Sequence, residues 1–166
     1  KDFFCKFSFP TTNNQPIMIR KATTQDLDQL TNLFDQYAVF YKNPSNYEKH
    51  YAYLKERLEN NEATIFVASD ETNEDKLIGF ALIYVTFSSL ALNRILILND
   101  LFVDSSARKK GIGEKLILQT VELAKELGSH DIRLRTAKNN TVAQGLYHKM
   151  GFVREDFLYS YDLTVD

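Results

Sequence analysis

The sequence predicts an α/β (α+β) domain built around a mixed sheet. Short runs rich in β-branched and aromatic residues, bounded by turn residues, are typical of strands. Longer stretches with apolar residues three and four positions apart are typical of amphipathic helices. The two patterns follow each other without an internal repeat, which argues against a repetitive βαβ array. The predicted order is β-α-α-β-β-β-α-β-α-β.

The first half of the chain is predicted to contain one strand and two helices. "IMIRKAT" (17–23) alternates apolar and polar residues as a short strand does. Thr23 or Thr24 can cap the helix that follows, and Asp26 in its first turn favours the helix dipole. "KNPSN" ends this helix, and a second one is predicted from about residue 47 to residue 58.

Three strands are predicted next, at 64–69, 76–87 and 94–103, and the third is too apolar to lie at a sheet edge. A helix over 113–127 ends at Gly128, which suits a helix C-terminus. "DIRLRT" is predicted to be a strand, "NTVAQGLYHKMGF" a short helix stopped by Gly151, and "GFVREDFLYSYDL" a final strand.

The composition of the chain argues against several classes of protein. The chain has 166 residues and a net charge of -2, whereas general nucleic-acid binders usually carry a basic surface. Its single cysteine, Cys5, fits a reducing compartment, so a cytoplasmic location is expected. No apolar run approaches a membrane span, and no spacing of histidine, cysteine and carboxylate residues indicates a metal site. Residues 1–16 are interpreted as an N-terminal extension and residues 17–166 as the domain.

The stretch "ARKKGIG" (107–113) lies where a strand gives way to a helix. It is not a Rossmann or P-loop motif, because the third glycine and the G-K-[ST] sequence are absent. What remains is R-x-x-G-x-G leading into a helix, next to three cationic residues. Such a corner can hold an anion, since glycine lets a ligand approach the backbone and first-turn N–H groups are unsatisfied. A basic turn with glycines for packing is the competing interpretation.

The context of this motif resembles the GNAT superfamily of acyl-CoA-dependent N-acetyltransferases. An apolar strand, then [RQ]-x-x-G-x-[GA], then a helix is similar to motif A of that family. "NNTVAQGLYHKMGF" resembles its motif B, and "MIRKATTQDLDQL" its opening strand and helix. The similarity covers about residues 17–163. The segment 77–103 resembles the diamine (spermidine/spermine) acetyltransferases most. The resemblance implies the GNAT fold, with a mostly antiparallel sheet, and implies a homodimer.

The resemblance also implies that acetyl-CoA is bound. Its diphosphate would lie on the backbone amides of residues 108–113, and its pantetheine would follow the backbone of the preceding strand. The implied cofactor-binding residues are Leu101, Phe102, Val103, Arg108, Lys109, Lys110, Gly111, Ile112, Gly113, Asn140, Ala143 and Tyr147. Asn140 could equally be a helix cap.

Two residues are candidate catalytic groups. Tyr147 matches the family's frequent general acid, a phenol near the CoA sulfur, although a tyrosine on an amphipathic helix can also be a packing residue. Asp100 is the leading candidate for the base that takes the amine proton. A carboxylate inside an apolar run is costly to bury unless it is paired or functional, so a structural role remains equally open.

Substrate specificity is expected to come from the two early helices and from the segment after the second of these strands, "TFSSLALNR" (86–94). Tyr37 and Tyr41 could flank a cationic amine, and Asp35 could add charge, although most aromatic residues at helical spacing belong to the core. Asn99 replaces the glutamate that diamine acetyltransferases have at this point, which weakens the case for a polycation.

The sequence thus predicts direct acetyl transfer from acetyl-CoA to a primary amine of a polyamine, diamine or amino acid. No activated nucleophile is visible that would indicate a covalent enzyme intermediate. Two alternatives stay open at this point. One is an enzyme that acetylates protein N-termini or lysines, and the other is a non-catalytic module that binds acyl-CoA.

Overall fold

A computed structural model describes residues 17–70 and 73–165. The chain divides into two compact units, one up to Leu134 and one from Arg135 onward. The predicted extension, residues 1–16, lies outside the described residues. Within those residues, none of the helices has the length and the apolar character that crossing a bilayer requires.

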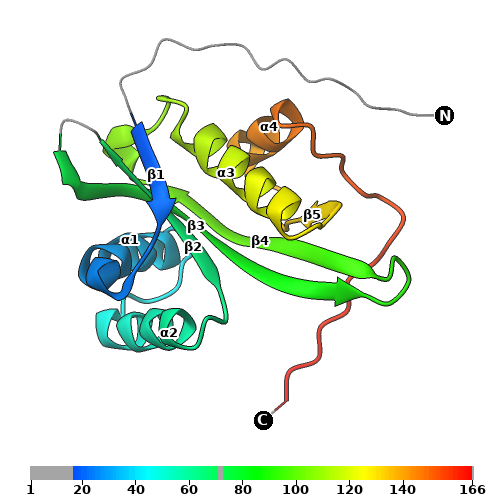
Figure 1. Cartoon of the computed structure of the whole chain (residues 1–166), viewed down its shortest axis with the longest axis horizontal. Coiled ribbons are helices and arrows are strands. Elements are labelled where there is room, and N and C mark those ends of the chain that lie inside the picture. Colours follow the sequence, from blue (N-terminus) through cyan, green and yellow to red (C-terminus); the bar gives the residue numbers. More distant parts are fainter. Residues whose placement is uncertain (1–16, 71–72, 166) are drawn as a thin grey trace. The chain divides into compact units, whose positions relative to one another are not determined.

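The first unit is built on one five-stranded sheet in the order β1-β2-β3-β4-β5 (Figure 1). Neighbouring strands run antiparallel except β4 and β5, which are parallel. The mostly antiparallel mixed sheet confirms the predicted fold class, and β4 lies inside the sheet as its apolar sequence indicates. The strands are β1 (Ile17–Lys21), β2 (Thr64–Asp70), β3 (Asn73–Ser88), β4 (Asn93–Val103) and β5 (Asp131–Arg133).

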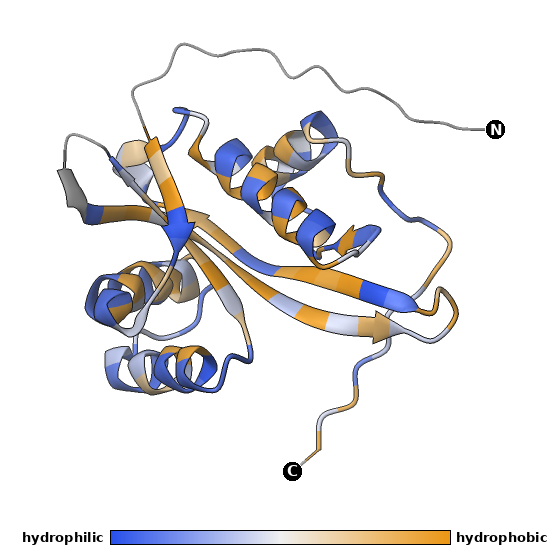
Figure 2. Ribbon diagram, in the orientation of Figure 1, coloured by the Kyte–Doolittle hydropathy of each residue, from blue (hydrophilic) through white to orange (hydrophobic). Residues whose placement is uncertain are grey.

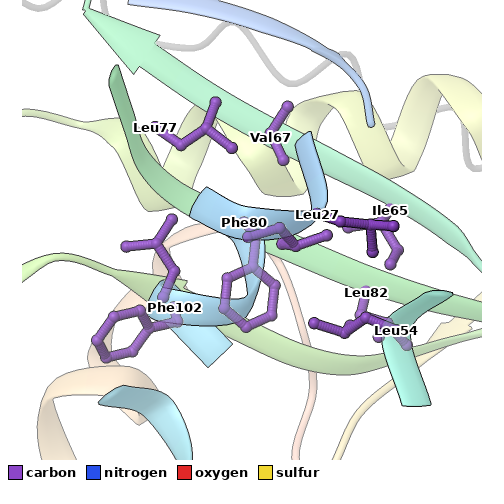
Figure 3. Packing of buried hydrophobic residues seen from close by; sticks show 10 residues of the cluster. Leu27, Leu54, Ile65, Val67, Leu77, Phe80, Leu82 and Phe102 are labelled. Carbon is purple, nitrogen blue, oxygen red and sulfur yellow. The ribbon is translucent and has the colours of Figure 1, made fainter. Parts of the chain in front are cut away.

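Helices cover both faces of this sheet. The helices α1 (Leu27–Phe40) and α2 (Tyr47–Glu59) pack on one face, and α3 (Ile112–Glu126) lies on the other (Figure 1). Apolar residues dominate the middle strands, as expected for a sheet covered on both sides (Figure 2). The cluster on the α1–α2 face comes from both helices and from β2, β3 and β4, and Figure 3 shows its members in contact. Its members include Leu27, Leu54, Ile65, Phe80, Leu82 and Phe102.

The entry to α1 is fixed by a polar cluster. Thr23 accepts a hydrogen bond from the Gln25 amide, and Asp26 accepts one from the Thr23 amide at 2.8 Å, which together form a capping box. Arg20 from β1 reaches the same Asp26 carboxylate with both guanidinium nitrogens, at 2.6 and 2.8 Å. Of the two predicted caps, Thr23 is the one formed, and it caps the short 3-10 turn Thr24–Asp26 that leads into α1. Asp26 is the N-cap residue of α1 itself and makes no side-chain capping bond to that helix.

A β-bulge interrupts β4 in its middle. Leu82 pairs with Asp100 and Ile83 pairs with Leu98, so that Asn99 is the extra residue on β4. A bulge changes which face the following side chains occupy. Asp100 pairs with a core residue of the α1–α2 face, and both residues are buried. The bulge thereby turns a carboxylate toward α1.

The second unit contains α4 (Thr141–Lys149), with Asn140 as its N-cap. The strand predicted after α4 is not formed, because residues 152–165 pair with no strand in the described part of the chain. An alternating sequence becomes a strand only where another backbone edge completes its hydrogen bonds. Alternation alone was therefore insufficient evidence for this strand.

Gly79 on β3 lies next to the end of β4 and to the start of α3. A Cβ atom at this position would lie 2.8 Å from the backbone oxygen of Phe102 and 3.5 Å from Cγ2 of Ile112. Because the nearest atom belongs to the backbone of β4, which is paired with β3 at this point, it cannot give way cheaply. The absence of a side chain lets β4 run close to β3 directly before the glycine loop.

We predict that Gly79→Ala lowers the free energy of unfolding by about 1–3 kcal/mol, the usual cost of overpacking. Urea unfolding followed by circular dichroism measures it. Gly145→Ala in α4 is the matched control. Its helical backbone and open surroundings predict an unchanged or slightly raised stability. Equal stability of Gly79→Ala and the wild type would show that β3 and β4 are less tightly apposed.

Candidate active site

The glycine loop leads directly into α3. Gly111 is the N-cap of this helix and makes no side-chain capping hydrogen bond. The N–H groups of the first helical turn are therefore not satisfied by a cap side chain. A helix N-terminus of this kind favours an anion both by hydrogen bonding and by its dipole.

The backbone of the loop adds to this anion-binding character. Gly111 has a φ of 76°, and Lys109, a residue with a side chain, has a φ of 64°. Left-handed residues that alternate with ordinary ones turn successive N–H groups to one side and form a concave nest for anions. Glycine at 111 was foreseeable from the motif, whereas the left-handed lysine was not.

The Arg108 side chain makes contacts within the protein. Its Nε donates to the backbone oxygen of Val103 at 3.1 Å. Its guanidinium carbon lies 5.8 Å from the ring centre of Phe102 and 5.9 Å from that of Phe40. Arg108 therefore joins the loop to the end of β4 and to α1. Lys109 and Lys110 are exposed.

The outer edge of β4 is open along its second half. Pairing with β5 covers Ile95, Leu96 and Ile97 and stops there. Within the described first unit, no strand pairs with the outer edge of residues 98–103. Backbone groups of Leu101 and Val103 on that edge are suited to an extended ligand. The Phe102 side chain is in the core and is buried.

Asp100 is the buried carboxylate of this strand. Only 7% of the residue is exposed. Tyr37 donates its hydroxyl hydrogen to Oδ1 at 2.6 Å, and the Asn99 amide donates to Oδ2 at 3.1 Å. Burial raises the pKa of the Asp100 carboxyl above its ordinary value, and the two hydrogen bonds partly offset the rise. A carboxylate with a raised pKa is a stronger proton acceptor than an exposed one.

Tyr37 connects Asp100 to an open cavity of about 310 Å³ between α1 and α2. Tyr37 is one of the lining residues, and its hydroxyl donates to Asp100. Both helices and the loop between them line the cavity, with Phe34 and Tyr37 from α1, Asn43 and Asn46 from the loop, and Lys49 and His50 from α2.

Asp35 and Tyr41, predicted to contact the acceptor, are not among the residues that line this cavity. The Asp35 carboxylate accepts hydrogen bonds from the Ser45 hydroxyl at 2.7 Å and the Asn46 amide at 2.9 Å, and it meets His50 Nδ1 at 2.9 Å. Tyr41 follows α1 and packs its ring against Tyr37, with ring centres 5.0 Å apart. Asp35 thus holds the α1–α2 loop in place.

Tyr53 and Tyr84 form a hydrogen-bonded pair near Asp100 that was not predicted from the sequence. The Tyr53 hydroxyl on α2 is hydrogen-bonded to the Tyr84 hydroxyl on β3. Burial raises the pKa of the Tyr84 hydroxyl, with a further contribution from its bond to Tyr53. Periodicity alone could not separate this pair from ordinary core aromatics, because the pairing requires knowing the register of β3 against α2.

Tyr147 lies on α4 in the second unit. Its ring packs edge-on against Phe152, with ring centres 5.8 Å apart. Asn140 caps α4 by accepting a hydrogen bond from the Ala143 amide at 3.2 Å. The capping role of Asn140 is therefore real. Cofactor contacts of Asn140, Ala143 and Tyr147 remain predictions.

The chain is similar to known proteins in sequence and in fold. The model of the acetyltransferase (GNAT) family matches residues 27–152. An uncharacterized N-acetyltransferase, YhfO of Bacillus subtilis (strain 168), is 39% identical over 147 residues, which cover 89% of this chain and 97% of the relative. The D-amino-acid N-acetyltransferase HPA3 of Saccharomyces cerevisiae is 35% identical over 54% of this chain and 55% of its own. The crystal structure of a probable acetyltransferase superposes with a TM-score of 0.84 at 35% identity, covering 90% of this chain and 98% of that one.

The chain therefore belongs to the acetyltransferase (GNAT) family. It is an acetyl-CoA-dependent N-acetyltransferase. The uncapped N-terminus of α3, the left-handed backbone at 109 and 111 and the open edge of β4 fit a ligand with a diphosphate and an extended tail.

We predict that Gly111→Glu abolishes binding of CoA, measured by isothermal titration calorimetry. The new carboxylate would stand at the helix N-terminus and repel the diphosphate. Gly128→Glu is the matched control, because it introduces the same charge at the other end of α3. Its backbone is similarly left-handed, with a φ of 66° against 76° at Gly111.

Both substitutions carry comparable backbone strain, so melting temperatures should fall together while CoA affinity separates them. Wild-type affinity in Gly111→Glu, or equal loss in both variants, would contradict the assignment of the cradle.

Proposed function

We propose that the enzyme transfers an acetyl group from acetyl-CoA directly to a primary amine of a small molecule. The observation that carries this proposal is the buried Asp100, held by a tyrosine that also lines the cavity. Asp100 and the loop at 108–113 follow one another on and after the same strand. One short segment thus carries both the predicted base and the predicted cofactor cradle.

Each residue of the predicted site then has a distinct task. The amides of 108–113 bind the diphosphate, and the backbone of 101–103 aligns the tail of the cofactor. The bound thioester supplies an activated acetyl carbon. Holding the amine next to it can account for about 7–11 kcal/mol of the barrier in favourable cases.

Proton transfer is assigned to two side chains. The amine of the acceptor is mostly protonated near neutral pH, as its pKa is about 10. Asp100 accepts the proton that the ammonium gives up, directly or through one water molecule, with Tyr37 holding the carboxylate in place. The Tyr147 hydroxyl donates a proton to the departing sulfur. The new nitrogen–carbon bond replaces the carbon–sulfur bond, and CoA leaves as the thiol. The nitrogen loses a second proton after this bond forms, and that proton would restore the Tyr147 hydroxyl, directly or through water.

A free-thiol assay with a panel of amino acids, diamines, polyamines and peptides tests the function. The proposal expects release of CoA thiol with small amines at rates well above hydrolysis. Faster turnover of peptides than of any small amine would favour a protein acetyltransferase instead. A rate equal to buffer hydrolysis throughout the panel would remove the catalytic proposal.

We predict that Asp100→Asn lowers kcat/KM by about 10²–10⁴, the usual contribution of a general base. Because burial raises the pKa of Asp100, the wild-type rate should rise with pH through that raised pKa, as the carboxylate becomes able to accept a proton. This acid limb should vanish in Asp100→Asn. Asp28→Asn, on the exposed start of α1, should keep both the rate and the profile. An unchanged profile in Asp100→Asn would exclude Asp100 as the base.

We predict that Tyr147→Phe lowers kcat by about 10²-fold or more while the KM for acetyl-CoA changes little. The phenyl ring preserves the packing against Phe152, so that only the proton donor is lost. Tyr161→Phe, on the exposed C-terminal segment, is the control. Steady-state kinetics that show equal kcat for the wild type and Tyr147→Phe would reject the role of general acid.

A further inference from the structure

The cavity between α1 and α2 carries charge of one sign. None of its lining residues is a carboxylate, and Lys49 supplies a positive charge. Lys49 forms no ion pair within the part of the chain that the structure describes. Its side chain is therefore available to an anion that enters from solvent.

The Asp35 carboxylate lies behind the wall and is not among the groups that line the cavity. Asp35 is engaged by the Ser45 hydroxyl, the Asn46 amide and His50 Nδ1. The hydrogen bond from Ser45, with those from Asn46 and His50, holds the pKa of the Asp35 carboxyl below its ordinary value. Asp35 stays ionised, and its hydrogen bonds direct the carboxylate toward the α1–α2 loop and toward His50.

The opposite kind of charge lies behind the α1 side of the cavity. Tyr37 forms that wall and donates to the Asp100 carboxylate at 2.6 Å. An acceptor whose amine reaches toward Asp100 would therefore extend along Tyr37 and Phe34 toward α2. The far end of such a molecule would approach Lys49 and His50.

We propose that the acceptor is an amino carboxylate, with its amine directed to Asp100 and its carboxylate bound by Lys49. This inference rests on the proposed function and specifies its substrate class. A diamine or polyamine would place a second ammonium against Lys49, where like charges repel. The cavity volume of about 310 Å³ lies at the lower end of the range for small-molecule sites, which suits a single amino acid.

Matched substrate pairs test the proposal. Lysine and cadaverine, ornithine and putrescine, and β-alanine and ethylamine differ only by a carboxylate. The proposal expects the carboxylated member of at least one pair to have a kcat/KM about tenfold higher or more, given the strength of hydrogen bonds to charged groups. A decarboxylated member that matches or exceeds its partner in every pair would overturn it.

Two variants of Lys49 test whether this side chain binds the carboxylate of the substrate. Lys49→Gln should lower kcat/KM for the preferred amino acid about tenfold and leave its decarboxylated partner nearly unchanged. Lys49→Glu should reverse the preference toward the diamine, because the reversed charge attracts the second ammonium. Lys55→Gln removes a positive charge from the same helix at a residue that faces Glu59 and does not line the cavity, so it should change neither substrate.

Equal losses for both members of a pair in Lys49→Gln would assign Lys49 a structural role and refute the carboxylate site. Failure of the proposed function gives a different result, namely no thiol release with any amine in the wild type. Melting temperatures close to that of the wild type in all three variants would verify that the exposed substitutions leave the fold intact.

Discussion

The hydrogen bond between the Tyr37 hydroxyl and the Asp100 carboxylate ties the two halves of the site together. Asp100 belongs to the strand that leads into the anion-binding loop, and Tyr37 belongs to the helix that forms a wall of the cavity. A buried carboxylate is stable only when its oxygens are hydrogen-bonded. Tyr37 and Asn99 meet this need without a neutralising ion pair, so that the pKa of Asp100 stays raised and the group can accept a proton. The β-bulge at Asn99 makes the arrangement possible, since it directs Asp100 toward α1.

Much of the fold could be predicted from local sequence patterns. Runs of β-branched residues predicted β2, β3 and β4. The apolar stripe of Leu27, Leu30 and Leu33 predicted α1, and Gly128 predicted the end of α3. These features depend on residues close in sequence. The final strand was predicted wrongly because a strand depends on a partner edge, which alternation does not reveal. The Asn99 bulge was equally invisible, because it is a property of the register between β3 and β4.

The candidate site was predictable where it depends on backbone motifs and less so where it depends on tertiary contacts. R-x-x-G-x-G marked the loop, and a lone acid in an apolar run marked Asp100. Asp35 was predicted from its charge to contact the acceptor, and this stays a prediction. Its hydrogen bonds with Ser45, Asn46 and His50 could not be foreseen from the sequence. No motif marked Lys49, and the role proposed for it rests on its place in the cavity and on the absence of carboxylates among the lining residues. The charge of a residue can be seen in the sequence, whereas the groups that it contacts are known only from the structure.

The most direct test of this account is a titration of the aspartate carboxyl carbons by ¹³C nuclear magnetic resonance in the unliganded protein. The account predicts one resonance with a pKa above the ordinary aspartate value, absent in Asp100→Asn and shifted to a still higher pKa in Tyr37→Phe, which lacks the stabilising hydroxyl. The account would be contradicted if every aspartate titrated at or below its ordinary value, or if Tyr37→Phe left the resonance of Asp100 where it was.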